Sequence, residues 1–275
     1  MSHIAFLGPE GTFTHQAASI LKDKLYDDST ELVYFDTIND VMDAVITSKC
    51  VKGVVPIENS IEGPVNVTLD ALVHEYDLMI EGEIVLPINH NLMAPKGLKL
   101  SDISDVYSHP QALAQCHNYI LNNSFRVHST SSTAAACKNI VNFKNSASIG
   151  TVKAAKLYGL NILDENIQDV DNNETRFVVL SKHDSRPTGN DKTSIVFSLH
   201  DDRPGGLYGI LGIFAEFSIN LSKIESRPSK QGLNKYVFFI NFEGHRQDED
   251  IGKILKLIGE NTSFFKVLGS YHLIQ

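Results

Sequence analysis

The residue pair with the clearest chemical potential in this chain is Thr175-Arg176, which stands where a polar stretch passes into an apolar run. Residues 171–174 are polar turn formers, and residues 177–180 are apolar and partly β-branched, so the sequence predicts a strand that opens at this pair. A guanidinium binds a carboxylate through two parallel hydrogen bonds, and a hydroxyl beside it suits an anionic substrate. The first 183 residues contain only two arginines, Arg126 and Arg176. On composition alone, the favoured alternative is an ordinary strand-end arginine paired with a nearby acid.

A second polar group, Glu58-Asn59-Ser60, follows a predicted strand at residues 53–57 and is closed by Gly63-Pro64. Acid, amide and hydroxyl side chains at the carboxyl end of a strand occupy the place where open α/β sheets bind ligands. Asn and Ser are also common in loops for local reasons. Both interpretations stay open on the pattern alone.

Two helix starts carry further polar side chains. A hydroxyl-rich turn precedes a predicted helix at residues 134–141, and its members are Ser129, Thr130, Ser131, Ser132 and Thr133. These hydroxyls could bind a carboxylate or simply cap the helix. His109 precedes Pro110 at the start of a predicted helix (residues 112–121) and could be an acid, a donor or a cap, of which the structural role is favoured.

The segment from Gly8 to Thr14 connects the first predicted strand to a helix at residues 15–25. A glycine-bearing loop at a helix start can seat an anion through free backbone N–H groups. The segment is not GxGxxG and lacks the lysine of a P-loop, so it does not indicate a nucleotide site. An ordinary connection capped by Thr12 or Thr14 is the favoured interpretation without other observations.

Composition narrows the function classes. A net charge of -9 over 275 residues argues against nucleic acid or an anionic membrane surface as a partner. The three cysteines form no CxxC pair, which favours reduced thiols and argues against a structural zinc site. The N-terminus lacks a signal-peptide pattern and no apolar run reaches membrane-spanning length, so we expect a cytoplasmic protein. We expect neither a cofactor nor a metal.

Strands and helices alternate through residue 182, which predicts an α/β domain with parallel pairing. A long extended stretch at residues 78–93 is the candidate crossover into a second lobe. We expect lobe one at about residues 1–77 plus 160–183 and lobe two at about residues 78–159. The Glu58-Asn59-Ser60 group, the hydroxyl turn and Thr175-Arg176 would then share one cleft mouth.

A Pro- and Gly-bearing polar linker at residues 184–191 separates this domain (residues 1–183) from a second one at residues 192–275. The second domain reads strand, helix, strand, strand, helix, strand, at about residues 192–200, 207–217, 220–227, 235–242, 248–261 and 265–273. This order predicts an α+β ferredoxin-like fold. Such small sheets expose a face or an edge, so a homo-oligomer is expected.

Together, these motifs resemble the prephenate dehydratase family along essentially the whole chain. The family's opening is similar to residues 8–13, its first-lobe site loop to residues 56–60, and its TRF signature to Thr175, Arg176 and Phe177. In the second domain, residues 225–228 match the ESRP motif. Residues 205–208 correspond to the GAL-type motif, with Gly206 where the family usually has alanine.

The resemblance implies a two-lobed catalytic domain shaped like a type II periplasmic binding protein, followed by an ACT regulatory domain that binds L-phenylalanine between two chains of a dimer or tetramer. Since the sequence begins at the dehydratase strand, we expect no chorismate mutase domain ahead of it. The implied regulatory residues are Gly205, Gly206, Leu207, Asn220, Leu221, Glu225, Ser226 and Arg227.

The implied reaction converts prephenate to phenylpyruvate with loss of carbon dioxide and water. We expect Thr175 to donate to the leaving hydroxyl and Arg176 to hold a substrate carboxylate. The expected substrate-binding residues are Glu58, Asn59, Ser60, His109, Ser129, Thr130 and Ser131, with Glu58 orienting its neighbours and His109 as a reserve acid. Arogenate is the alternative substrate, and a non-catalytic ligand-sensing module is the alternative class.

Overall fold

The computed structural model describes residues 2–26, 29–200, 204–229 and 235–274. They form two compact units, one made of Met1–Thr68 with Val85–Phe177 and the other of Leu69–Ile84 with Val178–Gln275. Both units mix helices and strands, as the sequence predicts. Among the helices in the described ranges, none combines the length and apolarity needed to cross a membrane.

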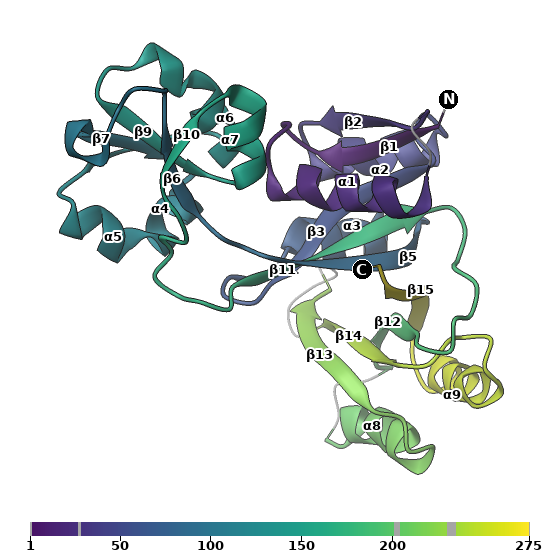
Figure 1. The fold of residues 1–275 in the computed structure, drawn as a ribbon. Helices are drawn as coiled ribbons and strands as arrows, with labels where there is room; N and C mark the ends of the chain where they lie inside the picture. Colours follow the sequence, from purple (N-terminus) through teal and green to yellow (C-terminus); the bar gives the residue numbers. More distant parts are fainter. Residues whose placement is uncertain (1, 27–28, 201–203, 230–234, 275) are drawn as a thin grey trace. The chain divides into compact units, whose positions relative to one another are not determined.

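The first unit opens with a parallel sheet whose strands alternate with helices along the chain (Figure 1). The sheet order β3-β1-β2 requires crossovers in opposite directions, and right-handed crossovers then place α1 and α2 on opposite faces. This arrangement brings the carboxyl ends of all three strands to one edge. The elements are β1 (His3–Leu7), α1 (Phe13–Leu25), β2 (Glu31–Phe35), α2 (Ile38–Ile46), β3 (Lys52–Asn59) and the short β4 (Gly63–Pro64), which pairs with β3.

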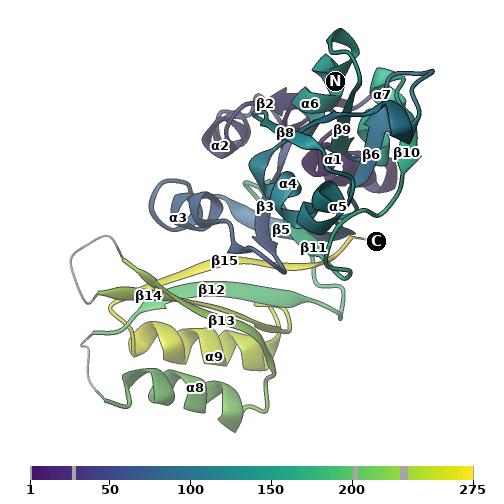
Figure 2. The ribbon, with the colours of Figure 1, turned by 90° about the vertical axis from the view of Figure 1, so that its left-hand side faces the viewer.

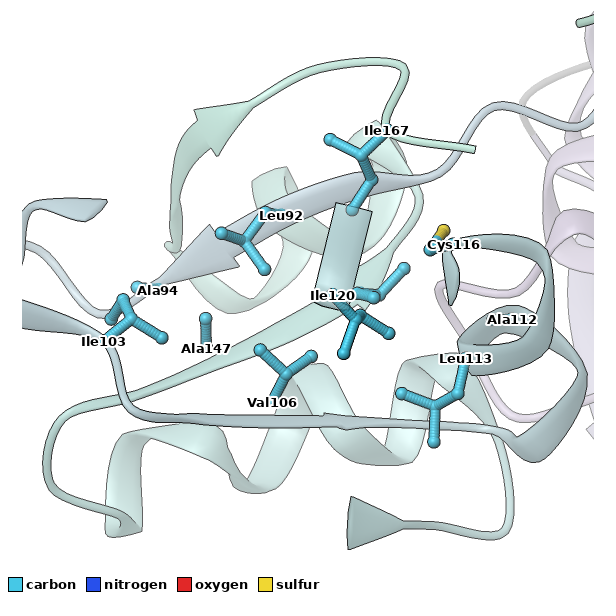
Figure 3. Close-up of a cluster of buried hydrophobic side chains, with 11 residues drawn as sticks. Leu92, Ala94, Ile103, Val106, Ala112, Leu113, Cys116, Ile120, Ala147 and Ile167 are labelled. Carbon is cyan, nitrogen blue, oxygen red and sulfur yellow. The ribbon is translucent and has the colours of Figure 1, made fainter. Parts of the chain in front are cut away.

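The same unit contains a second, five-stranded sheet of order β10-β6-β9-β7-β8. Its core gathers Leu92, Val106 and Ile120 from two strands and a helix into one buried cluster (Figure 3). The strands are β6 (Asn91–Ala94), β7 (Asp105–Ser108), β8 (Arg126–Ser129), β9 (Ser146–Gly150) and β10 (Asn161–Asp164). The helices are α4 (Pro110–Gln115), α5 (His117–Asn122), α6 (Thr133–Asn139) and α7 (Val152–Tyr158), with 3₁₀ turns at Leu100–Asp102 and Ile140–Asn142.

Three predicted elements differ from the structure. The predicted helix at residues 112–121 is broken at Cys116, a fully buried residue whose packing lets the two short helices face one core. The stretch at residues 78–93 is interrupted after Pro87, because the N–H of Ile88 donates to Asn173 O instead of to a sheet ladder. Residues 160–183 are predicted to return to lobe one, but Asn161–Asp164 pairs with β6 in the second sheet.

The second unit contains the predicted βαββαβ order, which is confirmed. Its sheet runs β13-β14-β12-β15, with both helices on one face (Figure 2). The elements are β12 (Lys192–Ser198), α8 (Gly206–Glu216), β13 (Leu221–Pro228), β14 (Tyr236–Glu243), α9 (Glu249–Glu260) and β15 (Phe264–Leu273). Phe214, Phe242 and Ile254 are fully or almost fully buried between sheet and helices.

Three earlier elements connect to this unit. β5 (Met79–Pro87) extends its sheet by pairing in parallel with β15, while α3 (Asn66–His74) and β11 (Glu174–Ser181) each begin in the first unit and end in the second. The predicted linker is packed onto β15: Ser185 Oγ donates to Ser270 O at 2.7 Å, and Asp184 Oδ1 accepts from Ser270 N at 3.1 Å. The exact domain boundaries stay a prediction.

Gly269 in β15 occupies a position that only glycine can fill. Its φ of +149° is rare for other residues, and an added Cβ would lie 2.1 Å from Ile80 O in β5. We expect Gly269→Ala to lower the free energy of unfolding by at least about 2 kcal/mol, measured by urea denaturation. The control is Gly252→Ala in α9, where the nearest atom is 3.9 Å away and helix propensity predicts a gain of up to about 1 kcal/mol. Equal stability of Gly269→Ala and the unmodified chain would contradict the packing described for β5 and β15.

Candidate active site

A cavity of about 480 Å³ lies within the first unit, where the carboxyl ends of β1 and β3 meet the starts of helices α1, α2, α4 and α6. Strand ends and helix starts are where α/β folds place ligand contacts. The lining residues are Leu7, Gly8, Thr12, Phe13, Thr14, Asp36, Ile38, Pro56, Asn59, Val65, Ile88, His90, His109, Gln111, Ala112, Gln115, Ser131, Ser132, Thr133, Thr175 and Phe177.

The side chains of Asn59 and Thr175 meet in the wall of this cavity, although 116 positions separate them in the sequence. Asn59 Nδ2 donates to Thr175 Oγ1 at 2.9 Å, and it shares its two hydrogens with Asn173 Oδ1 at 2.7 Å and Glu174 O at 3.1 Å. Both residues are buried, with Asn59 at 7% and Thr175 at 9% exposure. The adjacency of β3 and the first half of β11 produces this contact.

The orientation of the Asn59 amide follows from its backbone partners. The N–H groups of Ile61 and Glu62 donate to Asn59 Oδ1 at 3.0 and 2.9 Å, so that atom must be the oxygen. The Nδ2 group therefore faces Thr175, and the threonine oxygen accepts. Within the described residues, no acceptor is recorded for the Thr175 hydroxyl hydrogen. That hydrogen is available to a ligand in the cavity.

The side chains of Arg176 and Glu58 point away from the cavity, because successive side chains of a strand alternate between its two faces. Arg176 Nη1 and Glu58 Oε2 form an ion pair at 2.8 Å, with side-chain exposures of 21% and 27%. Neither residue lines the cavity. The pair joins β3 to β11 behind Asn59 and Thr175, so the structure shows the strand-end ion pair that composition favours.

The cavity gathers some of the sequence-predicted site residues and leaves others outside. Asn59, His109, Ser131, Thr175 and Phe177 line it. Glu58, Ser60, Ser129, Thr130 and Arg176 do not. Ser60 instead contacts the start of β11, where its Oγ accepts from Glu174 N at 2.9 Å. Thr130 Oγ1 donates to Ser132 O at 2.9 Å. The functional roles of all ten residues stay predictions.

The cavity wall can bind an anion through the dipoles of helix starts, because it has no lysine or arginine among its described residues. Among the described residues that line it there is no Lys or Arg, and Asp36 is an acid. Helices α1, α4 and α6 begin at the cavity, with Thr12, His109 and Ser132 as their N-caps. The unpaired N–H groups and positive dipole end of a helix start stabilise a carboxylate.

The Gly8–Thr14 loop is held in one conformation by contacts on both sides. Gly11 has a φ of +91° and donates from its N–H to His15 Nδ1 at 2.9 Å, while Thr151 Oγ1 donates to Gly11 O at 2.7 Å. His15 also stacks on Phe6 at a centroid distance of 4.9 Å. Burial, and to a smaller extent the Lys153 ammonium, lowers the pKa of His15 to about 4. The loop therefore rests on a neutral imidazole.

Sequence reasoning missed several lining residues. Gln111 and Gln115 are four positions apart on α4 and share a helix face, a spacing that could have been read as a polar stripe beside His109. His90 had no such signal, because its position depends on the turn between β5 and β6. For Thr12, Phe13 and Thr14, the sequence allows an anion-binding loop but favours an ordinary strand-to-helix connection.

The predicted regulatory residues lie in three places in the second unit: at the start of α8, just after its end, and along β13. Gly205, with a φ of +87°, Gly206 and Leu207 start α8, whereas Asn220 and Leu221 follow its end. An eleven-residue helix separates the two groups by about 16 Å. In β13, the side chains of Glu225 and Arg227 are partly buried and that of Ser226 is exposed on the other face.

Two ion pairs occupy the partly buried face of β13. Glu225 Oε2 pairs with Lys223 Nζ at 3.1 Å, and Arg227 Nη2 pairs with Asp70 Oδ1 of α3 at 3.0 Å. Both residues of the second pair belong to the second unit. The ESRP segment is therefore tied to α3, the helix that follows β3 and β4 in the chain.

We expect the stability of the first unit to depend on pH through His15. The pKa of His15 in the folded protein, about 4, lies below the ordinary value of 6.5. Between these two pH values the unfolded chain binds a proton at His15 that the folded protein does not bind. The free energy of unfolding should therefore be fully present above pH 6.5 and fall as pH drops towards 4. Urea titrations across this window should show a shallower slope in His15→Gln, which keeps an acceptor for Gly11. Part of the slope should remain, because burial also lowers the pKa of His90. An unchanged slope in the variant would contradict the assignment.

Comparison with known proteins agrees with the motifs. Residues 4–185 match the family model described as prephenate dehydratase, and residues 193–258 match that of the ACT domain. A prephenate dehydratase of Methanocaldococcus jannaschii is 44% identical over 268 residues, covering 96% of this chain and 95% of the relative.

Two solved structures share the fold over nearly the whole chain. The prephenate dehydratase of Arthrobacter aurescens, in complex with L-Phe, is 34% identical with a TM-score of 0.88, covering 99% of this chain and 90% of that one. A protein described as a novel type of quorum quenching acylase is 26% identical with a TM-score of 0.87, covering 98% of both chains. The predicted fold class, a periplasmic-binding-protein-like α/β domain followed by an ACT domain, is confirmed. The chain belongs to the prephenate dehydratase family.

Proposed function

We propose that this chain converts prephenate to phenylpyruvate, carbon dioxide and water, with Thr175 as the hydrogen-bond donor to the departing hydroxyl. The bond from the ring to its carboxylate breaks, and its electron pair enters the ring as carbon dioxide leaves. The ring C–O bond breaks at the other end, and the departing hydroxide takes up one proton to become water. Aromatisation supplies the driving force, so the site must orient the substrate and assist the leaving group.

The observation that carries this proposal is the direction of the hydrogen bond between Asn59 and Thr175. A hydroxyl that accepts from Asn59 keeps its hydrogen for the substrate oxygen, on which negative charge develops as the C–O bond breaks. Threonine is too weak an acid to give up its proton alone, so we assign it a donor role, and the one proton that the reaction consumes comes from the bulk solvent. The shared fold with an acylase means that the fold alone does not support an activity, and the proposal rests on the site.

The two carboxylates of prephenate need other partners. We propose that the starts of α1 and α6 receive them, since these helices bring backbone N–H groups to a wall whose described lining residues include no Lys or Arg. Arg176 then acts from behind the wall: its pair with Glu58 holds β3 against β11 and thereby sets the distance between Asn59 and Thr175.

Replacing Thr175 tests the donor role directly. Thr175→Val keeps the shape and removes the hydroxyl, so kcat should fall by about 10²–10³ while KM changes little. The matched control Thr175→Ser keeps the hydroxyl and should retain kcat within about tenfold. Phenylpyruvate formation from prephenate is measured by its absorbance in alkali, with arogenate offered in parallel as the alternative substrate. A Thr175→Val variant that turns over normally would remove Thr175 from the mechanism.

We further propose that L-phenylalanine binds to the ACT domain and inhibits the enzyme. The Arthrobacter aurescens structure holds L-Phe, and the start of α8 offers N–H groups to an amino-acid carboxylate. Because Gly206 and Asn220 lie at opposite ends of α8, one ligand can meet both only if they come from two chains. This geometry supports a homo-oligomer assembled through ACT domains. A cytoplasmic location is also proposed, in keeping with three buried free thiols.

The pair between Arg227 and Asp70 allows direct and indirect roles of the ESRP motif to be separated. If Arg227 acts through α3, then Arg227→Ala and Asp70→Ala should weaken inhibition by L-phenylalanine to a similar extent, and calorimetric binding of L-phenylalanine should persist in both. Lys253→Ala, which removes a cation whose ion pairs lie within α9, is the control and should leave inhibition unchanged. Loss of binding in Arg227→Ala alone would instead place Arg227 in contact with the ligand.

A further inference from the structure

His90 is the most deeply buried ionisable side chain in the wall of the cavity, and sequence reasoning gave it no role. Its side chain is 3% exposed and packs edge-on against Phe13 at a centroid distance of 5.9 Å. Its Nε2 lies 2.9 Å from Gln115 Oε1. Its Nδ1 is buried and has no hydrogen-bond partner among the described residues.

A chain of side-chain amides connects this imidazole to Thr175. Asn59 Nδ2 donates to Asn173 Oδ1 at 2.7 Å, and Asn173 Nδ2 donates to Gln115 Oε1 at 3.0 Å. Gln115 Oε1 is also the atom that faces His90. The charged group joined to this chain is Glu62, which accepts from Gln115 Nε2 at 3.4 Å.

The direction of every bond in the chain follows from two backbone donors. Ile61 and Glu62 fix the oxygen of Asn59, so its NH₂ group must face an oxygen of Asn173. The NH₂ group of Asn173 must then face an oxygen of Gln115. An oxygen that faces the ring requires a donor there, so the hydrogen of His90 sits on Nε2.

The unpartnered Nδ1 leads independently to the same tautomer. A buried N–H without an acceptor is costly, whereas a bare imidazole nitrogen in an apolar setting costs less. Burial lowers the pKa of His90, which keeps the ring neutral. With the hydrogen on Nδ1 instead, two acceptors would face each other at 2.9 Å, and Gln115 and Asn173 would both have to turn over.

We infer that His90 is a positioning residue for the dehydration: by donating from Nε2 to Gln115, it holds in place the far end of the amide chain whose direction Ile61 and Glu62 set, and so supports the arrangement that leaves the Thr175 hydrogen free for the substrate. The inference rests on the function proposed for Thr175. His90 acts through Gln115, Asn173 and Asn59. Its loss would release Gln115, and with it the arrangement of amides behind Thr175.

The tautomer is measurable without any assay of activity. Nitrogen-15 NMR of the full chain at pH 7, with the His90 signals identified by their absence in His90→Gln, should show a neutral ring protonated at Nε2. A ring protonated at Nδ1 would overturn the inference whatever the enzyme turns over. The NMR result therefore separates failure of this inference from failure of the proposed function.

Two variants test the consequence for turnover. His90→Gln can place an NH₂ group near the former Nε2 and should keep kcat for prephenate within about fivefold. His90→Leu has no donor and should lose about 10- to 100-fold in kcat, with KM within threefold and an unchanged urea midpoint. If His90→Leu is folded and as active as His90→Gln, His90 is not a positioning residue. If His90→Leu does not fold, His90→Gln alone decides. A loss of kcat in His90→Gln as large as that of Thr175→Val would show that His90 is not a positioning residue.

Discussion

Two backbone N–H groups, those of Ile61 and Glu62, set the chemistry of this site. They bind the oxygen of the Asn59 side chain and so determine which way its amide faces. Everything behind the cavity wall follows in sequence: Asn59 donates to Thr175 and Asn173, and Asn173 donates to Gln115. A hydroxyl group can both accept and donate, and this constraint assigns Thr175 the accepting role towards the protein. The donating role is then left for a ligand.

Strand alternation explains why neighbouring residues of the same motif have different surroundings. In β11, Thr175 and Phe177 face the cavity while Arg176 points away and pairs with Glu58. The same alternation in β3 separates Asn59 from Glu58. The cavity wall thus carries neutral donors and the acid Asp36, while the Arg176 cation lies behind the strands. Such a wall suits a reaction in which charge leaves the substrate, because a fixed cation beside the departing carboxylate would favour the substrate over carbon dioxide.

The sequence predicts the parts of this fold that depend on local pattern. Alternating strands and helices, the βαββαβ order and the strand ahead of Glu58-Asn59-Ser60 all follow from periodicity and turn residues. It does not predict that Cys116 breaks a helix, because burial of that thiol is decided by the second sheet. It also does not predict β10, a four-residue strand whose partner β6 lies about seventy positions earlier.

For the site, the polar types at strand ends and helix starts could be found in advance, and Asn59, His109, Ser131, Thr175 and Phe177 do line the cavity. The sequence could not show which side chains of each strand face the cavity and which face away from it. The sequence places Thr175 and Arg176 together at the substrate, since adjacent residues look equivalent until the buried face of the strand is known. His90 and Asn173 were beyond reach because each lies in a turn whose position depends on contacts more than twenty residues away, such as that between His90 and Gln115.

In the proposed mechanism, Asn59 turns the Thr175 hydrogen towards the substrate. The most direct measurement is kcat for prephenate in Asn59→Asp, a variant of equal shape that still accepts from Ile61 and Glu62 but presents an oxygen, in place of NH₂, to Thr175. The Thr175 hydroxyl would then donate to the introduced carboxylate, and we expect kcat to fall by about 10²–10³. Because the new oxygen also faces Asn173 Oδ1 and Glu174 O, the urea midpoint should fall as well, so kcat is measured in the absence of urea at a temperature where the variant is fully folded. A kcat within about threefold of the unmodified chain, at saturating prephenate, would contradict the account.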